Sequence, residues 1–151
     1  MLDHPDIVAD RNLVDLGCGS GLVAIAAAKA GARSVTAIDV DPYAIVATQL
    51  NATANDVVVA TVCADILAGD PPTTDIILVG DLFYDSELAE RVTAFLDRCL
   101  TANIEILVGD PWRTPLPRAR LELITEHPGL DFGDTSTATR MNAVFRFIAT
   151  E

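Results

Sequence analysis

One short segment, residues 15–21 (Asp-Leu-Gly-Cys-Gly-Ser-Gly), most constrains what this chain can fold into. An apolar run at 13–16 leads into it, and an alanine-rich segment at 22–30 follows it, so it joins a predicted strand to a predicted helix. Glycines allow a sharp turn and a close approach of backbone to a ligand. A glycine-rich turn between a strand and a helix is typical of ligand-binding turns in open α/β sheets.

The rest of the chain alternates between short apolar runs and helical segments. Strands are predicted at 13–16, 34–38, 57–63, 75–79, 104–108, 121–126 and 143–148. Helices are predicted at 22–30, 43–54 and 87–100, the last capped by Ser86. This alternation predicts an α/β fold, a doubly wound and mostly parallel seven-stranded sheet with an antiparallel strand near the C-terminus. A plain dinucleotide-binding fold or another open α/β sheet has the same strand pattern. The length of 151 residues predicts a single domain over 1–151.

Composition narrows the classes of partner. The formal charge of −12 disfavours nucleic acid, whose affinity for proteins depends on Lys and Arg meeting phosphates. No apolar run reaches the roughly 18 residues of a membrane span, and no charged-then-apolar leader is visible. Three scattered cysteines form no C-x-x-C pair, so neither a disulfide framework nor a metal site is predicted. The expected compartment is the cytoplasm; the oligomeric state is not visible in the sequence.

The spacing of the glycines argues against a dinucleotide. The usual pyrophosphate fingerprint has its third glycine one place after Gly21, where this chain has Leu22. Asp15, directly before the turn, would repel a pyrophosphate but suits a ligand ammonium group. The turn therefore favours a positively charged ligand, although a tight turn without any ligand is the structural alternative.

A row of carboxylates strengthens this interpretation. Each member follows or ends a predicted strand, where ligands bind in open α/β sheets: Asp15, Asp39, Asp65, Asp81 and Asp110. A single aspartate at such a place is commonly only a helix cap. Five together predict a negative rim, which disfavours phosphates and favours a cation because charges about 4 Å apart interact by several kcal/mol near a protein surface.

These residues resemble the cofactor motifs of class I methyltransferases, which use S-adenosylmethionine, a ligand with a sulfonium and an ammonium group. The resemblance implies that Asp39 binds the ribose hydroxyls and that Asp65, followed by Ile66, binds the adenine. It also implies that the turn glycines flank the methionine moiety and that Asp15 lies near its ammonium group: Gly17, Gly19 and Gly21. The expected cofactor is thus S-adenosyl-L-methionine.

Three further segments make the resemblance more specific, because they are similar to one family of methyltransferases. Residues 80–85 (Gly-Asp-Leu-Phe-Tyr-Asp) are similar to the Asp-x-x-Tyr signature of the electron-transfer-flavoprotein β-subunit lysine methyltransferase family. Residues 109–113 (Gly-Asp-Pro-Trp-Arg) and 2–6 (Leu-Asp-His-Pro-Asp) also resemble segments of that family. The family usually has a further N-terminal segment with Trp residues and a Gly-Gln pair, which has no counterpart in this sequence, and the segment after Pro111 is short and proline-rich. The resemblance implies N-methylation of lysine on a protein with a basic, lysine-containing loop, and it makes the flavoprotein β subunit a candidate substrate.

The resemblance also implies roles for individual residues. Asp81 would hold the incoming ammonium group, and Tyr84 would position the amine through its hydroxyl or its ring face. No strong general base is needed if the lysine proton escapes to water before transfer. Asp110 and Arg113 are substrate-side candidates: Asp110 lines the pocket or caps the loop before Pro111, and Arg113 pairs with Asp110 or guides an acidic substrate group. The structural alternative for Asp81 and Tyr84 is a helix cap and a core aromatic residue.

Other functions stay open at this point. One is N-methylation of a small amine such as nicotinamide, although the chain has Asp-Leu-Phe-Tyr at 81–84 where such enzymes have Asn-Pro-Pro-Tyr. A second is a non-catalytic module that binds the cofactor or a partner protein. A third is a nicotinamide-dinucleotide oxidoreductase, which requires NAD to bind in preference to S-adenosylmethionine.

Overall fold

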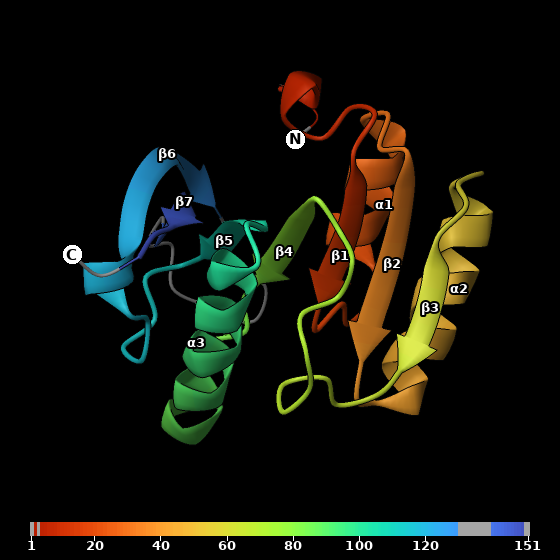
Figure 1. Cartoon of the computed structure of the whole chain (residues 1–151). Coiled ribbons are helices and arrows are strands. Elements are labelled where there is room, and N and C mark those ends of the chain that lie inside the picture. The colour runs from red at the N-terminus through yellow and green to blue at the C-terminus, as the bar shows by residue number, and fades with distance from the viewer. Residues whose placement is uncertain (1, 3, 130–139, 150–151) are drawn as a thin grey trace.

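The computed structural model describes residues 2, 4–129 and 140–149 (Figure 1). Its helices are α1 (Leu22–Lys29), α2 (Pro42–Ala54) and α3 (Ser86–Thr101), with short 3-10 helices η1 (Pro5–Ile7) and η2 (Arg118–Arg120). Its strands are β1 (Asn12–Leu16), β2 (Ser34–Asp39), β3 (Ala60–Cys63), β4 (Ile76–Gly80), β5 (Glu105–Asp110), β6 (Leu121–Gly129) and β7 (Arg140–Phe147). The alternation of strands and helices predicted from the sequence is confirmed.

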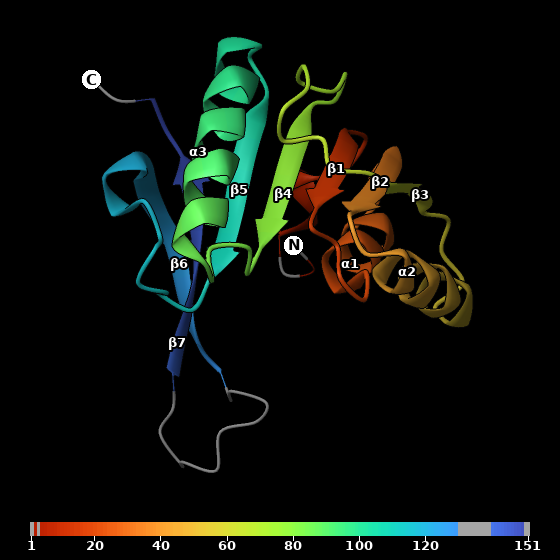
Figure 2. The ribbon, with the colours of Figure 1, turned by 90° about the horizontal axis from the view of Figure 1, so that it is seen from below.

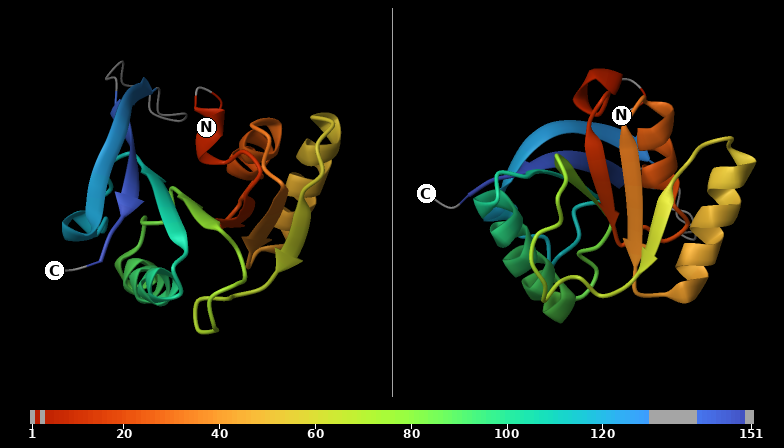
Figure 3. Two further views of the ribbon diagram at one scale, coloured as in Figure 1. Left: turned by 45° about the horizontal axis from the view of Figure 1, so that its top comes forward. Right: turned by 45° about the vertical axis from the view of Figure 1, so that its right-hand side comes forward.

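The described strands form one seven-stranded sheet in the order β3-β2-β1-β4-β5-β7-β6. The first five are parallel, and β7 runs antiparallel to both β5 and β6 at the end of the sheet away from β3 (Figure 3). The predicted doubly wound sheet with an antiparallel strand near the C-terminus is confirmed. The strand order reverses at β1, because β2 and β3 lie on one side of it and β4 and β5 on the other. Open α/β sheets bind ligands at such a switch point, beyond the carboxyl ends of the strands.

Helices cover both faces of the sheet, α3 on one and α1 with α2 on the other (Figure 2). Successive side chains of a strand point to opposite faces, so each central strand contributes to two cores. In β1, Val14 and Leu16 pack in the core under α3, whereas Leu13 packs in the core under α1. Asp15 alternates with them and points toward α1, which places a carboxylate beside the start of that helix.

Several boundaries differ from the sequence prediction: β6, for example, extends to Gly129, and β7 begins at Arg140. The cap of α3 is Asp85, whose side chain accepts a hydrogen bond from the Leu88 amide at 3.0 Å, so the assignment of this cap to Ser86 was wrong. The third strand begins at Ala60 rather than at residue 57, because it pairs among the described strands with β2 alone and the register of that pair starts at Thr36 opposite Ala60. A β-branched run predicts strand tendency but not how far a neighbouring strand extends.

Among the residues that the structure describes, no helix is both long and apolar enough to cross a membrane. The described part of the chain likewise holds no group of three or more His, Cys, Asp or Glu side chains that could bind a metal ion.

Candidate functional site

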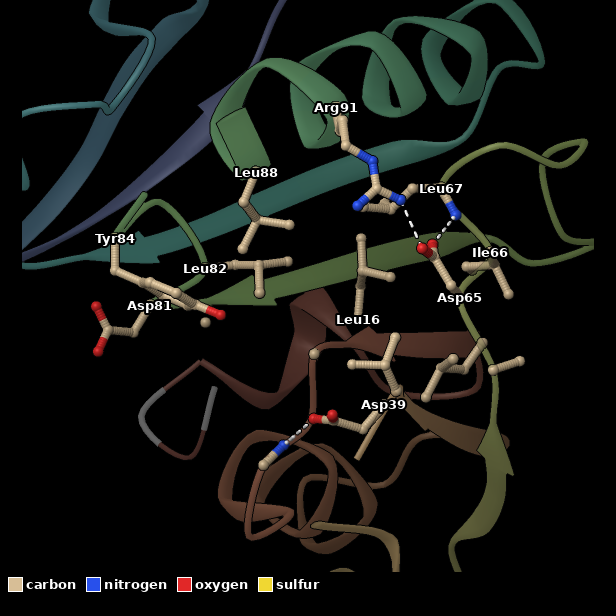
Figure 4. A pocket seen from close by; sticks show the side chains of 16 residues that line it. Leu16, Asp39, Asp65, Ile66, Leu67, Asp81, Leu82, Tyr84, Leu88 and Arg91 are labelled. Carbon is tan, nitrogen blue, oxygen red and sulfur yellow. Dashed lines mark hydrogen bonds and ion pairs between the residues drawn. The ribbon is translucent and has the colours of Figure 1, made fainter. Parts of the chain in front are cut away.

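Two cavities lie along the carboxyl ends of the strands. The first has a volume of about 560 Å³, within the usual range of small-ligand sites. Its walls combine aliphatic side chains with three carboxylates: Leu16, Ile38, Ile66, Leu67, Leu82, Leu88, Asp39, Asp65 and Asp81. In Figure 4, Asp65 and Arg91 lie at one end of this cavity, and Tyr84 and Asp81 lie at the other. An elongated, partly apolar ligand fits such a space.

The second cavity has a volume of about 890 Å³ and lies on the other side of the glycine turn. It is lined by Asp15, Asp110 and Arg113, together with residues of β7. Four residues line both cavities: Gly17, Gly19, Gly80 and Asp81. A ligand that extends from the first cavity therefore presents its far end to the second cavity beside Asp81.

The glycine turn is locked by Thr48 of α2. Gly17, Gly19 and Gly21 all have positive φ angles, which side chains with a Cβ rarely adopt. A Cβ on Gly21 would lie 2.8 Å from the fully buried Thr48 side chain. The Thr48 hydroxyl also donates a hydrogen bond of 3.1 Å to the Gly19 carbonyl. By contrast, a Cβ on Gly19 would meet no atom within 4 Å, so this glycine leaves open space for a ligand.

Asp15 is buried, with 1% of its surface exposed, and has a structural role that the sequence did not reveal. Its Oδ2 accepts a hydrogen bond of 2.9 Å from the Ala24 amide, in the first turn of α1. The residue preceding that helix, Gly21, has no side chain to cap it, so Asp15 satisfies this amide from the neighbouring strand. Burial raises the pKa of Asp15 to about 7, the Ala24 hydrogen bond lowers it, and the charge of Asp39 raises it further. A cation bound beside this carboxyl group would offset the cost of its ionisation.

Asp39 connects the end of β2 to the glycine turn. Its Oδ2 accepts a hydrogen bond of 2.9 Å from the Gly19 amide (Figure 4). Its Oδ1 accepts one of 3.0 Å from the Asp41 amide. These bonds fix the carboxylate at the wall of the first cavity. Each oxygen keeps a lone pair, so the pair can still accept hydrogen bonds from a vicinal diol.

Asp65 is paired with Arg91 of α3, a residue that no sequence motif singled out. Arg91 Nη2 lies 2.5 Å from Asp65 Oδ2, and the Leu67 amide donates a 3.0 Å bond to Oδ1. The hydrogen bond from Arg91 is the main cause of the lowered pKa of Asp65, and the Leu67 bond adds to it. Ile66 lies next to this pair in the wall, as Figure 4 shows. The end of the cavity thus offers an apolar wall beside an ion pair.

Asp81 does not cap a helix, and Tyr84 is not a core residue. The guanidinium group of Arg113 holds both oxygens of Asp81, with Nε bonded to Oδ1 and Nη2 at 2.8 Å from Oδ2. Asp81 also has a φ of +53°, an unusual backbone conformation that is enriched at functional sites. Tyr84 lines the first cavity with 61% of its surface exposed, whereas its neighbour Phe83 is fully buried. The core-aromatic alternative therefore applies to Phe83.

Asp110, at the end of β5, is buried with 2% of its surface exposed. Its Oδ1 accepts a hydrogen bond of 2.6 Å from the Arg113 amide, so it does cap the turn after Pro111. Its Oδ2 has no hydrogen-bond partner among the described residues. Burial raises the pKa of Asp110, and the charge of Asp81 adds to the effect, while the bond from the Arg113 amide opposes it. The Arg113 guanidinium pairs with Asp81 rather than with Asp110, which corrects one of the two sequence-based options for Arg113.

The five carboxylates do lie at one edge of the sheet, but they do not form a uniformly negative rim. Arginines pair with Asp65 and Asp81, whereas Asp15 and Asp110 are buried. Asp39 lines the first cavity and accepts hydrogen bonds from backbone amides. The expectation of a continuous negative edge was therefore wrong, because side chains from α3 and from the loop after β5 neutralise two members. Negative charge without an arginine partner is concentrated around the glycine turn.

Comparison with known proteins agrees with this arrangement. Residues 2–95 match the family model described as ribosomal protein L11 methyltransferase (PrmA). A relative from Danio rerio, electron transfer flavoprotein beta subunit lysine methyltransferase, is 40% identical over 115 residues, which are 75% of this chain and 45% of the relative. The chain thus spans about half the length of the curated relatives that it matches.

Solved structures share the fold. The ribosomal protein L11 methylase of Lactobacillus delbrueckii superposes with a TM-score of 0.66 at 19% identity, covering 98% of this chain and 75% of that one. Magnesium protoporphyrin IX methyltransferase of Synechocystis, solved with bound SAM, gives a TM-score of 0.68 at 15% identity, covering 97% of this chain and 74% of that one. At such identities these likenesses concern the fold alone, but the family model covers well over half of the sequence. This chain therefore belongs to the ribosomal protein L11 methyltransferase (PrmA) family.

Proposed function

We propose that this protein is an S-adenosylmethionine-dependent methyltransferase that methylates lysine side chains of a protein. The observation that carries the proposal is the meeting of the two cavities at Gly17, Gly19, Gly80 and Asp81. A donor in the first cavity and an amine in the second are brought together at that junction. Alignment of two reactants can supply about 7–11 kcal/mol of a reaction barrier. The relatives named as lysine methyltransferases, which align with 75% of this chain, support the choice of acceptor.

The residues of the first cavity, together with Asp15 in the second, fit the cofactor. Asp39 offers two fixed oxygens to the ribose hydroxyls, and the wall at Ile66 offers an apolar surface to the adenine beside Asp65. The open space at Gly19 admits the methionine moiety, and Asp15 supplies a buried carboxyl group for its ammonium. When bound, S-adenosylmethionine supplies a methyl group to the amine as its carbon–sulfur bond breaks and its sulfonium becomes a neutral thioether.

The acceptor amine enters through the second cavity and meets the donor at the junction, beside Asp81 of both cavities and Tyr84 of the first. Asp81 attracts the ammonium group of a lysine, and the exposed ring of Tyr84 offers it a cation–π surface. Arg113, which pairs with Asp81, keeps the carboxylate oriented until the substrate arrives.

We propose the electron transfer flavoprotein β subunit as the first substrate to test, because relatives that align with 75% of this chain are named for it. The proposed compartment is the cytoplasm, a reducing environment, and it is consistent with three free thiols: Cys18, Cys63 and Cys99.

The test is a set of three reactions, each with the protein and methyl-labelled S-adenosylmethionine. The acceptor is recombinant electron transfer flavoprotein β subunit in the first, ribosomal protein L11 in the second and nicotinamide in the third. We expect label on lysine residues of the β subunit, located by mass spectrometry of its peptides. Label on nicotinamide alone would favour the small-amine alternative. Binding of the cofactor without labelling of any acceptor would favour a non-catalytic module, and both results would contradict the proposal.

A further inference from the structure

The second cavity contains a buried carboxylate with one unused oxygen. Asp110 lines this cavity with Asp15, Asp81 and Arg113, and its Oδ2 has no hydrogen-bond partner among the described residues. A buried polar group left unpaired costs about 1–3 kcal/mol, so such groups are rare and are concentrated where they have a function. The unpaired oxygen points to a ligand group that donates a hydrogen bond or a proton.

Asp81 and Asp110 are adjacent but differ in what they can accept. The Asp81 amide donates a 2.8 Å bond to the carbonyl of Gly109, so the two turns are joined directly before Asp110. Arg113 then contacts both carboxylates: its side chain occupies both oxygens of Asp81, and its amide holds only Oδ1 of Asp110. An ionised carboxylate held by a guanidinium group is a weak base, whereas burial of Asp110 favours its protonated form.

We propose, on the basis of the proposed lysine methylation, that Asp110 accepts through Oδ2 the proton that the substrate ammonium must lose before methyl transfer. The N–H bond of the ammonium breaks, its electron pair stays on nitrogen as the attacking lone pair, and an O–H bond forms on Asp110. The carboxylate becomes a neutral carboxylic acid, which loses its proton to water after the product leaves. Asp81 with Arg113 orients the substrate and does not take the proton. Escape of the proton to water alone, the simplest expectation from the sequence, is then not the main route.

The pH dependence of the chemical step distinguishes this role from a structural one. Among the described residues, the other charged or titratable groups that line the same cavity are Asp15, Cys18, Asp81, Arg113 and His127. They remain in an Asp110→Asn variant, so a difference between the variant and the wild type isolates Asp110. The Asn side chain keeps the acceptor for the Arg113 amide and has nearly the same volume. Without the carboxylate, the amine must lose its proton to water, and the rate then follows the fraction of neutral amine.

The experiment measures single-turnover methyl transfer to the flavoprotein β subunit, at saturating S-adenosylmethionine, from about pH 7 to about pH 9.5. We expect Asp110→Asn to be slower by about 100-fold at neutral pH, within the range for loss of an acid–base group. Its rate should rise about tenfold per pH unit, as expected for a lysine whose pKa is near 10.4, while the wild-type rate levels off. Asp70→Asn, the same change in an exposed loop, is the control and should follow the wild type.

Two results would overturn the inference. One is a constant ratio between the Asp110→Asn and wild-type rates across the pH range, since a structural defect lowers the rate by the same factor throughout. The other is a wild-type rate that itself rises about tenfold per pH unit over the whole range, as expected for a free lysine. This second result needs no variant, so it tests the inference even if Asp110→Asn does not fold. A wild type that labels no acceptor at all contradicts the proposed function instead.

Discussion

Replacing Asp15 by Asn should stabilise the ligand-free protein at alkaline pH. The raised pKa of Asp15, about 7 in place of 3.8, means that the folded protein binds more protons than the unfolded chain between these two values. Stability of the wild type therefore falls as pH rises through this window and levels off above the folded pKa. When the pH is raised from about 5.5 to about 8.5, the free energy of unfolding of the wild type should fall by about 2 kcal/mol relative to that of Asp15→Asn. The Asn oxygen can still accept the hydrogen bond from the Ala24 amide.

Urea unfolding of both proteins at the two pH values provides the measurement. Asp70→Asn carries the same charge change outside the site and should follow the wild type. Asp15→Asn should bind S-adenosylmethionine about 100-fold more weakly than the wild type, because hydrogen bonds to charged groups are worth about 1.5–3 kcal/mol. A stability difference that does not change with pH would show that Asp15 is ionised in the free protein. Natural proteins commonly lose stability where a site is prepared for its ligand.

Removing the Asp81 carboxylate should reduce methyl transfer on the order of 1000-fold. In Asp81→Ala, the carboxylate beside the Arg113 guanidinium is removed, and the positive charge of Arg113 repels the substrate ammonium as a like charge. Two unit charges about 4 Å apart near a protein surface interact by about 4 kcal/mol, and each 1.4 kcal/mol is about tenfold in rate. Steady-state kinetics with the flavoprotein β subunit would show the loss mainly in kcat/KM.

A second variant separates charge repulsion from general damage to the site. In Asp81→Ala/Arg113→Ala, the positive charge at residue 113 is gone as well, so we expect recovery of about tenfold over the single variant at low ionic strength. Added salt should raise the rate of Asp81→Ala, because salt screens like charges. A double variant that is as slow as Asp81→Ala at every salt concentration would contradict the proposed repulsion. Near-normal activity of Asp81→Ala would remove this residue from catalysis.

The sequence predicted the fold well because its signals are local. The glycine turn, the strand-end aspartates and the alternating apolar runs each depend on a few neighbouring residues, and together they imply the order of the elements. Boundaries were less certain where a distant partner decides them. The cap of α3 is Asp85 rather than Ser86, and β3 starts where β2 can pair with it, at Ala60.

The arrangement of charge at the site could be predicted only in part. The sequence placed five carboxylates at one edge of the sheet, but not the arginines that pair with two of them. Arg91 is one of several exposed charged residues on α3, and nothing in its spacing connects it to Asp65, 26 positions earlier. The same holds for Thr48, whose contact with the glycine turn depends on how α2 packs against β2. Pairings across the fold arise from tertiary packing, which leaves no periodic pattern in a single sequence.

The most direct test of the account is a calorimetric titration of the ligand-free protein with S-adenosylmethionine and, separately, with NAD. The protein should bind the cationic donor with a dissociation constant on the order of 10 µM, a binding free energy of about −7 kcal/mol. The features expected to hold the donor are Asp15, Asp39 and the open space at Gly19. NAD should give no binding heat and should not displace the donor. Tight binding of NAD with no response to S-adenosylmethionine would contradict the account.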